Sequence, residues 1–144
     1  MIVVDASVLA PALADDGPDG DIARARLRGE TLAAPELIDL ETTSVIRRLS
    51  RAGHLDQRRA ELALTDLVEL PLRRAAHRPL LPRCGELRHN LTVYDAAYVA
   101  FAEALEIRLL TADARLANAS GPRCEIELLS RRTRNRALSD PGSG

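Results

Sequence analysis

Short apolar runs alternate along the chain with longer segments whose apolar residues recur with the period of a helix. The run "IVV" at residues 2–4 predicts a buried strand, and "ASVLAPALA" at 6–14 is compatible with a helix. The same reasoning predicts strands at 68–74, 107–111 and 125–129, helices at 19–27, 35–51, 55–68 and from 92 onward, and a short helix or loop at 79–89. Strands that alternate with helices predict an α/β fold with a parallel sheet covered on both faces.

Turn signals set the limits of a predicted helical hairpin. Pro35 suits the first position of a helix, because a residue there needs no backbone N–H donor. We therefore predict one helix from Pro35 to about Arg51 that stops at Gly53, followed by a second helix that packs back on the first.

Composition indicates one globular domain with an unusual end. The chain has 144 residues, of which 46% are hydrophobic and 28% charged. All 20 basic residues are arginines, and the end, "RRTRNRALSDPGSG", joins four of them to turn-forming residues. We predict a domain over residues 1–130 and a basic, mobile tail over 131–144. The tail is either a solvated end or a phosphate contact.

Other residue types exclude several classes of function. Cys84 and Cys124 stand far apart with no partner spacing, which predicts small hydrophobic side chains in a reducing compartment. The histidines show no ligand spacing, so we assign them no chemistry. The longest uncharged run, 6–14, is too short to span a membrane. We therefore expect a cytoplasmic protein with no membrane segment.

Three aspartates have ordinary structural explanations when each is taken alone. Asp5 follows the strand "IVV" and Asp113 follows "RLLTA", so either could cap the helix that comes next. Asp95 could complement the dipole in the first turn of its helix, beneath a cap at Thr92.

Glu41 is harder to explain by local structure. At helical spacing it falls between Leu37 and Val45 on an apolar stripe, where a carboxylate is costly unless it is paired. Arg48 lies one turn further on near the same stripe, so an ion pair with another acid is an alternative at this point.

A parallel sheet would bring these four acids to one edge, because ligand sites collect at the carboxyl ends of the strands. Carboxylates crowded in one pocket repel each other and raise their own pKa values unless a cation is present. Mg²⁺ prefers such oxygen ligands and keeps several waters. A site of this kind can activate water and hold a phosphate, as hydrolysis of a phosphodiester requires.

Four blocks in order and spacing resemble the PIN-domain nucleases, in particular the VapC-type toxins: "IVVDAS", "APELIDLE", "TVYDAAYVAFAEAL" and "LLTADARL". The resemblance covers roughly residues 1–130. It implies that the metal ligands and catalytic acids are Asp5, Glu41, Asp95 and Asp113. It also implies supporting hydroxyls at Ser7 and Thr111. Ser44 stands where family members often carry asparagine, and its hydroxyl can still donate a hydrogen bond.

The resemblance further implies a three-layer fold with about five parallel strands and a Mg²⁺ or Mn²⁺ cofactor. The implied activity is endonucleolytic hydrolysis of RNA, in which three aspartates hold the metal and Glu41 binds it or orients the attacking water. The products would carry a 5′-phosphate and a 3′-hydroxyl. The implied partners are a second copy of the chain and a VapB-type antitoxin that inhibits the toxin.

Two other classes of function compete with this interpretation. A PIN-like module could bind RNA or protein without cutting. A phosphate-handling enzyme of the receiver or haloacid-dehalogenase type also places an acid after its first strand, but those families use a lysine that this chain lacks. The three aromatic residues share one helix that we expect to be buried, so no stacking platform for bases is expected.

Overall fold

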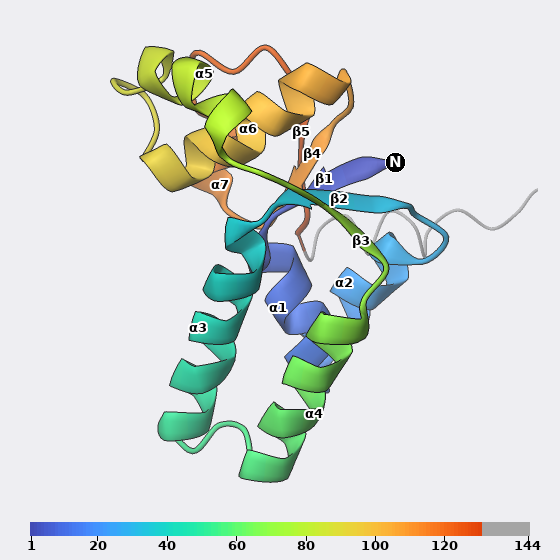
Figure 1. Cartoon of the computed structure of the whole chain (residues 1–144). Coiled ribbons are helices and arrows are strands. Elements are labelled where there is room, and N and C mark those ends of the chain that lie inside the picture. The colour runs from blue at the N-terminus through green and yellow to red at the C-terminus, as the bar shows by residue number, and fades with distance from the viewer. Residues whose placement is uncertain (131–144) are drawn as a thin grey trace, which may run out of the picture.

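A five-stranded parallel sheet forms the centre of the protein (Figure 1). The computed structural model describes residues 1–130, so the tail expected at 131–144 lies outside the described residues. The sheet order is β3-β2-β1-β4-β5. The strands are β1 (Ile2–Val4), β2 (Leu32–Pro35), β3 (Leu72–Ala75), β4 (Leu109–Thr111) and β5 (Ile126–Leu128).

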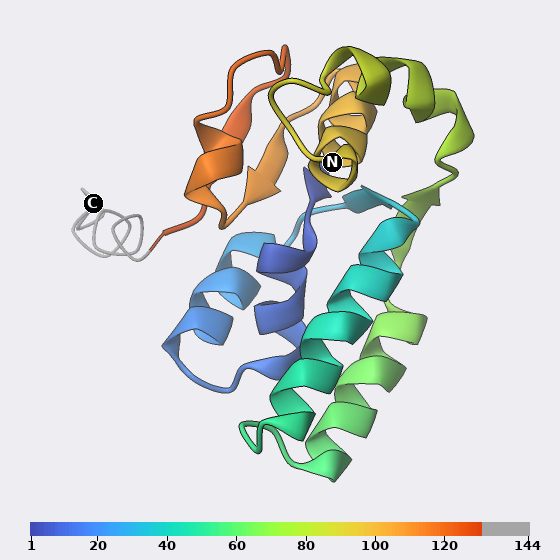
Figure 2. The same ribbon diagram turned by 90° about the vertical axis from the view of Figure 1, so that its left-hand side faces the viewer.

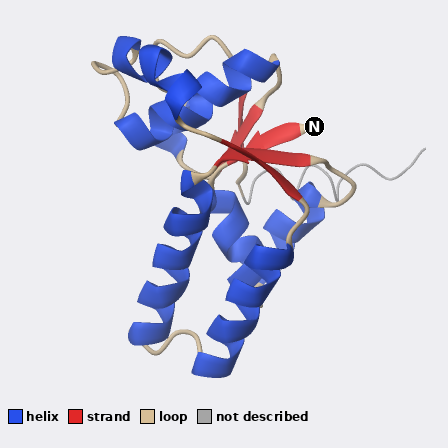
Figure 3. Ribbon diagram, viewed as in Figure 1, coloured by secondary structure: helices blue, strands red, loops and turns tan. Residues whose placement is uncertain are grey.

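Helices cover both faces of this sheet, which confirms the three-layer α/β fold (Figures 1 and 3). One face carries α1 (Ala6–Ala14), α2 (Pro18–Leu27), α3 (Leu37–Arg51) and α4 (Gln57–Glu69). The other carries α5 (Leu81–Glu86), α6 (Val93–Leu105) and α7 (Ala114–Ala117), with a 3₁₀ turn at Arg78–Leu80 leading into α5. The crossovers from β1 to β2 and from β2 to β3 run in one direction across the sheet, whereas those from β3 to β4 and from β4 to β5 run in the other. Right-handed crossovers in opposite directions lie on opposite faces, so the chain changes face after β3.

The central strands are apolar because both of their faces are covered. Val3, Val4, Leu109 and Leu110 are fully buried, as expected for strands between two helical layers. Their side chains join those of α1 and α6 in one continuous core. The sheet is therefore a rigid base for whatever follows the carboxyl ends of β1 and β4.

The prediction that Pro35 starts a helix is wrong. Pro35 is the last residue of β2, where it is in register with Ala75 of β3, and α3 begins two residues later at Leu37. The strand contains two alanines, Ala33 and Ala34, which carry little β-propensity of their own. Burial between β1 and β3 fixes their conformation instead, and the pairing with β1 ends at Ala33, so Pro35 need not donate a hydrogen bond to that neighbour.

The predicted helical hairpin is present as α3 and α4, which run side by side away from the sheet (Figure 2). Gly53 has a φ of 78° in the turn between them, a conformation that glycine adopts at little cost. A second, smaller core holds the hairpin to the end of α1, through Ala14, Ile46, Leu55, Ala60 and Ala63.

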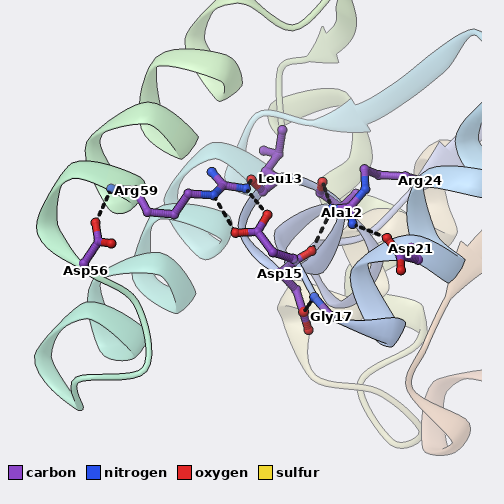
Figure 4. A network of polar contacts seen from close by, with 9 residues as sticks. Ala12, Leu13, Asp15, Gly17, Asp21, Arg24, Asp56 and Arg59 are labelled. Carbon is purple, nitrogen blue, oxygen red and sulfur yellow. Dashed lines mark hydrogen bonds and ion pairs between the residues drawn. The ribbon is translucent and has the colours of Figure 1, made fainter.

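Two arginines fix the turn between α1 and α2 (Figure 4). Arg59 of α4 donates a hydrogen bond of 2.8 Å to the carbonyl oxygen of Leu13 and pairs with Asp16. Arg24 of α2 donates to the carbonyl oxygens of Ala12 and Asp15. These contacts hold the end of α1 between its neighbours, and α1 starts directly after Asp5.

The two cysteines are free, with Cys84 buried and Cys124 half-buried. No helix within residues 1–130 combines the length and the apolar character that a membrane crossing needs.

Candidate active site

All four candidate acids line one cavity of about 550 Å³. Asp5 follows β1 and Asp113 lies two residues after β4, and these adjacent strands flank the point where the strand order reverses. Ligands of open α/β sheets bind at such a switch point. Glu41 and Asp95 come from the N-terminal turns of α3 and α6. The complete lining is Asp5, Ala6, Ser7, Ala10, Pro11, Glu41, Ser44, Val45, Arg48, Asp95, Tyr98 and Asp113.

Asp5 is held in place through both of its carboxylate oxygens. Oδ1 accepts from the hydroxyl of Ser7 at 2.5 Å and from the backbone N–H of Ser7 at 3.1 Å. Oδ2 accepts from the hydroxyl of Thr111 at 2.6 Å. Asp5 therefore does cap α1, as local reasoning allows, and the same contacts fix its carboxylate at the cavity wall.

The two hydroxyl groups also connect Asp5 to the segment that carries Asp113. Ser7 Oγ accepts from the backbone N–H of Ala112 at 2.8 Å, and Thr111 Oγ1 accepts from that of Asp113 at 3.0 Å. Asp113 in turn accepts from the N–H of Arg115 at 2.9 Å and so caps α7. Ser7 and Thr111 thus fix two acids relative to each other across the switch point.

Asp95 occupies the first turn of α6, where Thr92 caps the helix by accepting from the N–H of Asp95 at 3.2 Å. The remainder of α6 is buried on most sides, including Tyr98 and Phe101. Packing of this apolar helix against the sheet holds the half-buried Asp95 at the cavity. Asp95 therefore has the first-turn position that local reasoning predicts and also lines the cavity, and its role as a metal ligand stays a prediction.

Tyr98 is a site residue that sequence reasoning missed. Its hydroxyl donates a 2.7 Å hydrogen bond to Oε1 of Glu41, and its side chain is only 1% exposed. Burial and the contact with Glu41 raise the pKa of Tyr98, so the phenol keeps its proton and remains a donor. The signal for this role is helical spacing, because Tyr98 lies three residues after Asp95 on the same face. Tyr94, by contrast, is 62% exposed, which contradicts the expectation that every aromatic is buried.

His77 positions the helix that carries Glu41. Its Nε2 accepts from the backbone N–H of Leu37 at 2.9 Å, at the start of α3, where the N-cap residue Glu36 offers no side-chain hydrogen bond. Sequence reasoning assigned His77 no chemistry, and the contact joins segments too distant in sequence to predict from spacing.

The cavity disfavours negative charge on three of the four acids. Burial is the main cause that raises the pKa of Asp5 to about 6, and the charge of Asp95 adds to it. Burial and then the charge of Asp95 raise the pKa of Glu41, although the hydrogen bond from Tyr98 opposes the shift. Burial and then the charge of Asp113 raise the pKa of Asp95. The charge of Asp95 raises the pKa of both Asp5 and Glu41, and the charge of Asp113 raises that of Asp95, so Asp95 couples the acids electrostatically.

These residues suit a hard divalent cation by their chemistry. Asp5, Glu41 and Asp95 form no ion pair with any residue in 1–130. Among those residues, however, no group of three His, Cys, Asp or Glu side chains is already gathered as a metal site. Mg²⁺ is usually bound through one or two carboxylates and several waters, so a cavity of this size does not require direct contact with all four. The carboxylate oxygens of the cavity therefore suit a divalent cation, and the roles of the individual acids as its ligands remain predictions.

Ser44 and Arg48 line the same cavity, and both are exposed. The alternative in which Arg48 pairs with a nearby acid is not realised, since its guanidinium has no partner within residues 1–130. Ser44 is therefore at the site as the resemblance implies, one helical turn from Glu41.

Comparison with known proteins decides the family. The PIN domain profile matches residues 2–122. Ribonuclease VapC1 of Mycobacterium tuberculosis is 41% identical over 128 residues, which covers 88% of this chain and 96% of that protein. The chain belongs to the PIN-domain family. As a PIN domain it resembles PAE2754 from Pyrobaculum aerophilum, with a TM-score of 0.66, 25% identity, and coverage of 94% of this chain and 89% of that one.

A second solved structure shares the fold at lower identity. VapBC2 from Rickettsia felis, bound to a DNA fragment from its promoter, gives a TM-score of 0.65 at 15% identity. The match covers 90% of this chain and 100% of that one. The layered architecture around the cavity is therefore shared by proteins of low sequence identity to this chain.

Asp95→Asn should leave the metal-free protein as stable as the parent, or more stable. The raised pKa of Asp95 means that its ionised form costs folding free energy at pH 7, and a neutral side chain removes that cost. The opposing loss, the interaction with the dipole of α6, is worth about 0.3–1 kcal/mol. Urea unfolding at pH 7 in chelator measures the balance.

A matched control is Asp21→Asn, which removes a first-turn acid of α2 that lies outside the cavity and pairs with Arg24. This control should lose stability. If Asp95→Asn loses stability as Asp21→Asn does, Asp95 is only a helix-start acid.

Tyr98→Phe should raise the pKa of Glu41 further. The hydroxyl of Tyr98 stabilises the ionised carboxylate and so lowers the pKa that burial raises. Without it, Glu41 should take up its proton at a higher pH than in the parent. Carbon-13 NMR titration of metal-free protein labelled in glutamate measures this directly. Tyr94→Phe, which removes an exposed hydroxyl, should leave the titration unchanged. Equal Glu41 pKa values in the two variants would refute the role given to Tyr98.

Proposed function

We propose that the chain is the toxin of a toxin–antitoxin pair and an endoribonuclease that hydrolyses RNA phosphodiester bonds with Mg²⁺, or with Mn²⁺ in its place. The observation that carries this proposal is the set of four carboxylates, from four separate segments, that line one cavity at the switch point. The name of the relative VapC1, a ribonuclease that matches almost over its full length, supports the reaction class.

The metal ligands in this proposal are Asp5, Asp95 and Asp113, directly or through water, with Glu41 as a ligand or as the acceptor that orients the attacking water. A bound divalent cation would stabilise charge on the phosphate and lower the pKa of a coordinated water. The raised pKa values of Asp5, Glu41 and Asp95 support this assignment, because a cation would offset both the burial and the mutual repulsion that raise them.

The surrounding residues prepare the acids for this reaction. Ser7 and Thr111 hold the carboxylate of Asp5 by donating to both oxygens. Tyr98 occupies one oxygen of Glu41, which leaves the other oxygen to accept a hydrogen bond from the attacking water. Attack in line with the leaving oxygen breaks the bond from phosphorus to O3′. The products then carry a 5′-phosphate and a 3′-hydroxyl.

The proposed partners are a VapB-type antitoxin and a second copy of the chain. The VapBC2 complex, which shares this fold, supports an antitoxin partner, and the family resemblance supports the homodimer. We place the action in the cytoplasm, where RNA is available and free cysteines are stable.

Expression of the chain alone should arrest growth, and co-expression of the antitoxin should restore it. Normal growth with intact protein would argue against the toxin role.

Purified protein should cut RNA in Mg²⁺ or Mn²⁺ and stop when a chelator is added. Glu41→Gln and Asp95→Asn should each lower the cleavage rate by orders of magnitude, because each removes a charge that the cation requires. Glu69→Gln is the matched control, since Glu69 is exposed at the end of α4 and does not line the cavity. The rate is measured on a labelled RNA by gel electrophoresis.

Two outcomes would reject the proposal. Cleavage that persists in chelator after repurification would exclude the metal-dependent reaction. RNA binding without cleavage by the parent in either metal would favour a PIN-like module that binds without cutting.

A further inference from the structure

A second hollow of about 480 Å³ lies beside the acidic cavity on the outer face of α3. It is lined by Ser44, Arg48, Arg51 and Ala52. Ser44 and Arg48 also line the acidic cavity, so the two hollows meet at these side chains. The combined surface is strongly acidic at one end and basic at the other.

Helix geometry places the basic residues in a row that leads away from the acids. Ser44 and Arg48 are separated by four residues, and Arg48 and Arg51 by three, which are the spacings of neighbours on one helix face. From Glu41 to Arg51 the helix rises by about 15 Å. Because α3 runs outward from the sheet, this row extends from the cavity toward the tip of the hairpin (Figure 2).

Arg48 and Arg51 are exposed and have no hydrogen-bond or ion-pair partner for their side chains within residues 1–130. Many other arginines in the same part of the chain are engaged: Arg24, Arg26, Arg59, Arg74, Arg83 and Arg108 all form ion pairs. Arg48 lines the acidic cavity but forms no ion pair with its carboxylates within residues 1–130. Both guanidinium groups are available to a ligand.

We propose that Ser44, Arg48 and Arg51 form a subsite for the phosphates of the RNA strand next to the phosphodiester that is cut. This inference rests on the proposed function and adds a location to it. A guanidinium binds phosphate through two parallel hydrogen bonds, and Ser44 can donate a third from the point where the hollows meet. Contacts to phosphate position the strand without specifying its bases.

The charges explain why such a subsite is required. A cavity lined by four acids repels a polyanion, so the substrate needs attraction from cationic groups outside the carboxylates. The row on α3 begins at the cavity and carries that charge outward, which suits a strand that continues beyond the scissile bond. An acidic peptide could use the same guanidinium groups, and the experiment below distinguishes it from RNA.

The test measures the salt dependence of RNA binding in the Glu41→Gln background with Mg²⁺, where the proposed function predicts that single-stranded RNA stays intact. Arg48→Gln and Arg51→Gln should each reduce the slope of log K against log salt by about 0.7, and the double variant by about 1.4. Arg48→Lys retains the charge and should retain most of the slope. Fluorescence anisotropy gives the binding constants, and thermal melting confirms that each variant is folded.

The matched control is Arg28→Gln. Arg28 is exposed and has no side-chain partner within residues 1–130. It follows α2 and precedes the start of β2, at the amino ends of the strands, whereas the cavity lies at their carboxyl ends. It should leave the slope unchanged. With Glu41 intact, the two α3 variants should raise KM for RNA cleavage severalfold and leave kcat near the parent value, because their contacts lie beside the reacting phosphate.

Three results would overturn the subsite. A parent that cuts RNA while the α3 variants keep its slope and KM would reject the subsite alone. Slopes that fall equally in Arg28→Gln would show attraction to overall charge rather than to this row, and would also reject it. A parent that neither cuts nor binds RNA would reject the proposed function and the subsite with it, which leaves an acidic peptide as the ligand class for the arginines.

Discussion

The confinement of negative charge at the switch point is the constraint on which the rest of the structure depends. Burial and mutual repulsion raise the pKa values of Asp5, Glu41 and Asp95, so each ionised carboxylate costs free energy in the absence of a cation. The acids stay close together despite this free-energy cost because rigid elements of the fold hold them there. Asp5 and Asp113 follow buried strands, Asp95 lies in the first turn of α6, and Glu41 lies in the second turn of α3.

Hydrogen bonds decide how each acid is presented. Asp5 is held through both oxygens by Ser7 and Thr111, whereas Glu41 is held through one oxygen by Tyr98. This asymmetry suits different tasks: a fixed ligand on the strand and a carboxylate with a free oxygen on the helix. Arg48 and Arg51 of α3 would supply the positive charge that this site needs, because an acidic cavity repels a polyanion unless cationic groups lie nearby.

The sequence predicts much of this arrangement because the strongest signals are local. An apolar run that ends in an acid identifies Asp5 and Asp113, and an acid on an apolar helical stripe identifies Glu41. The weakest points are those that packing decides. Strand β2 was missed because its alanines carry no strand pattern, and its burial between two other strands determines its conformation.

Contacts between distant segments were also beyond prediction. The hydrogen bonds from Tyr98 to Glu41 and from Leu37 to His77 join residues far apart in sequence. Helical spacing could place Tyr98 on the face of Asp95, but it could not identify Glu41 or His77 as a partner. The exposure of Tyr94 was missed because it depends on which side of the first turn of α6 packs against the rest of the fold. Asp5 and Asp113 cap their helices and Asp95 lies in the first turn of α6, and all three also line the cavity, since a helix that starts at the sheet edge puts its first residues there.

The central claim is that the four acids form one site for a divalent cation. Anomalous X-ray diffraction from crystals soaked in Mn²⁺ tests it most directly. The account predicts a strong anomalous peak in the cavity, coordinated by at least two of the four carboxylates, and loss of that peak in Asp95→Asn. A cavity without a peak under conditions that support RNA cleavage, or a peak coordinated by other residues, would contradict it.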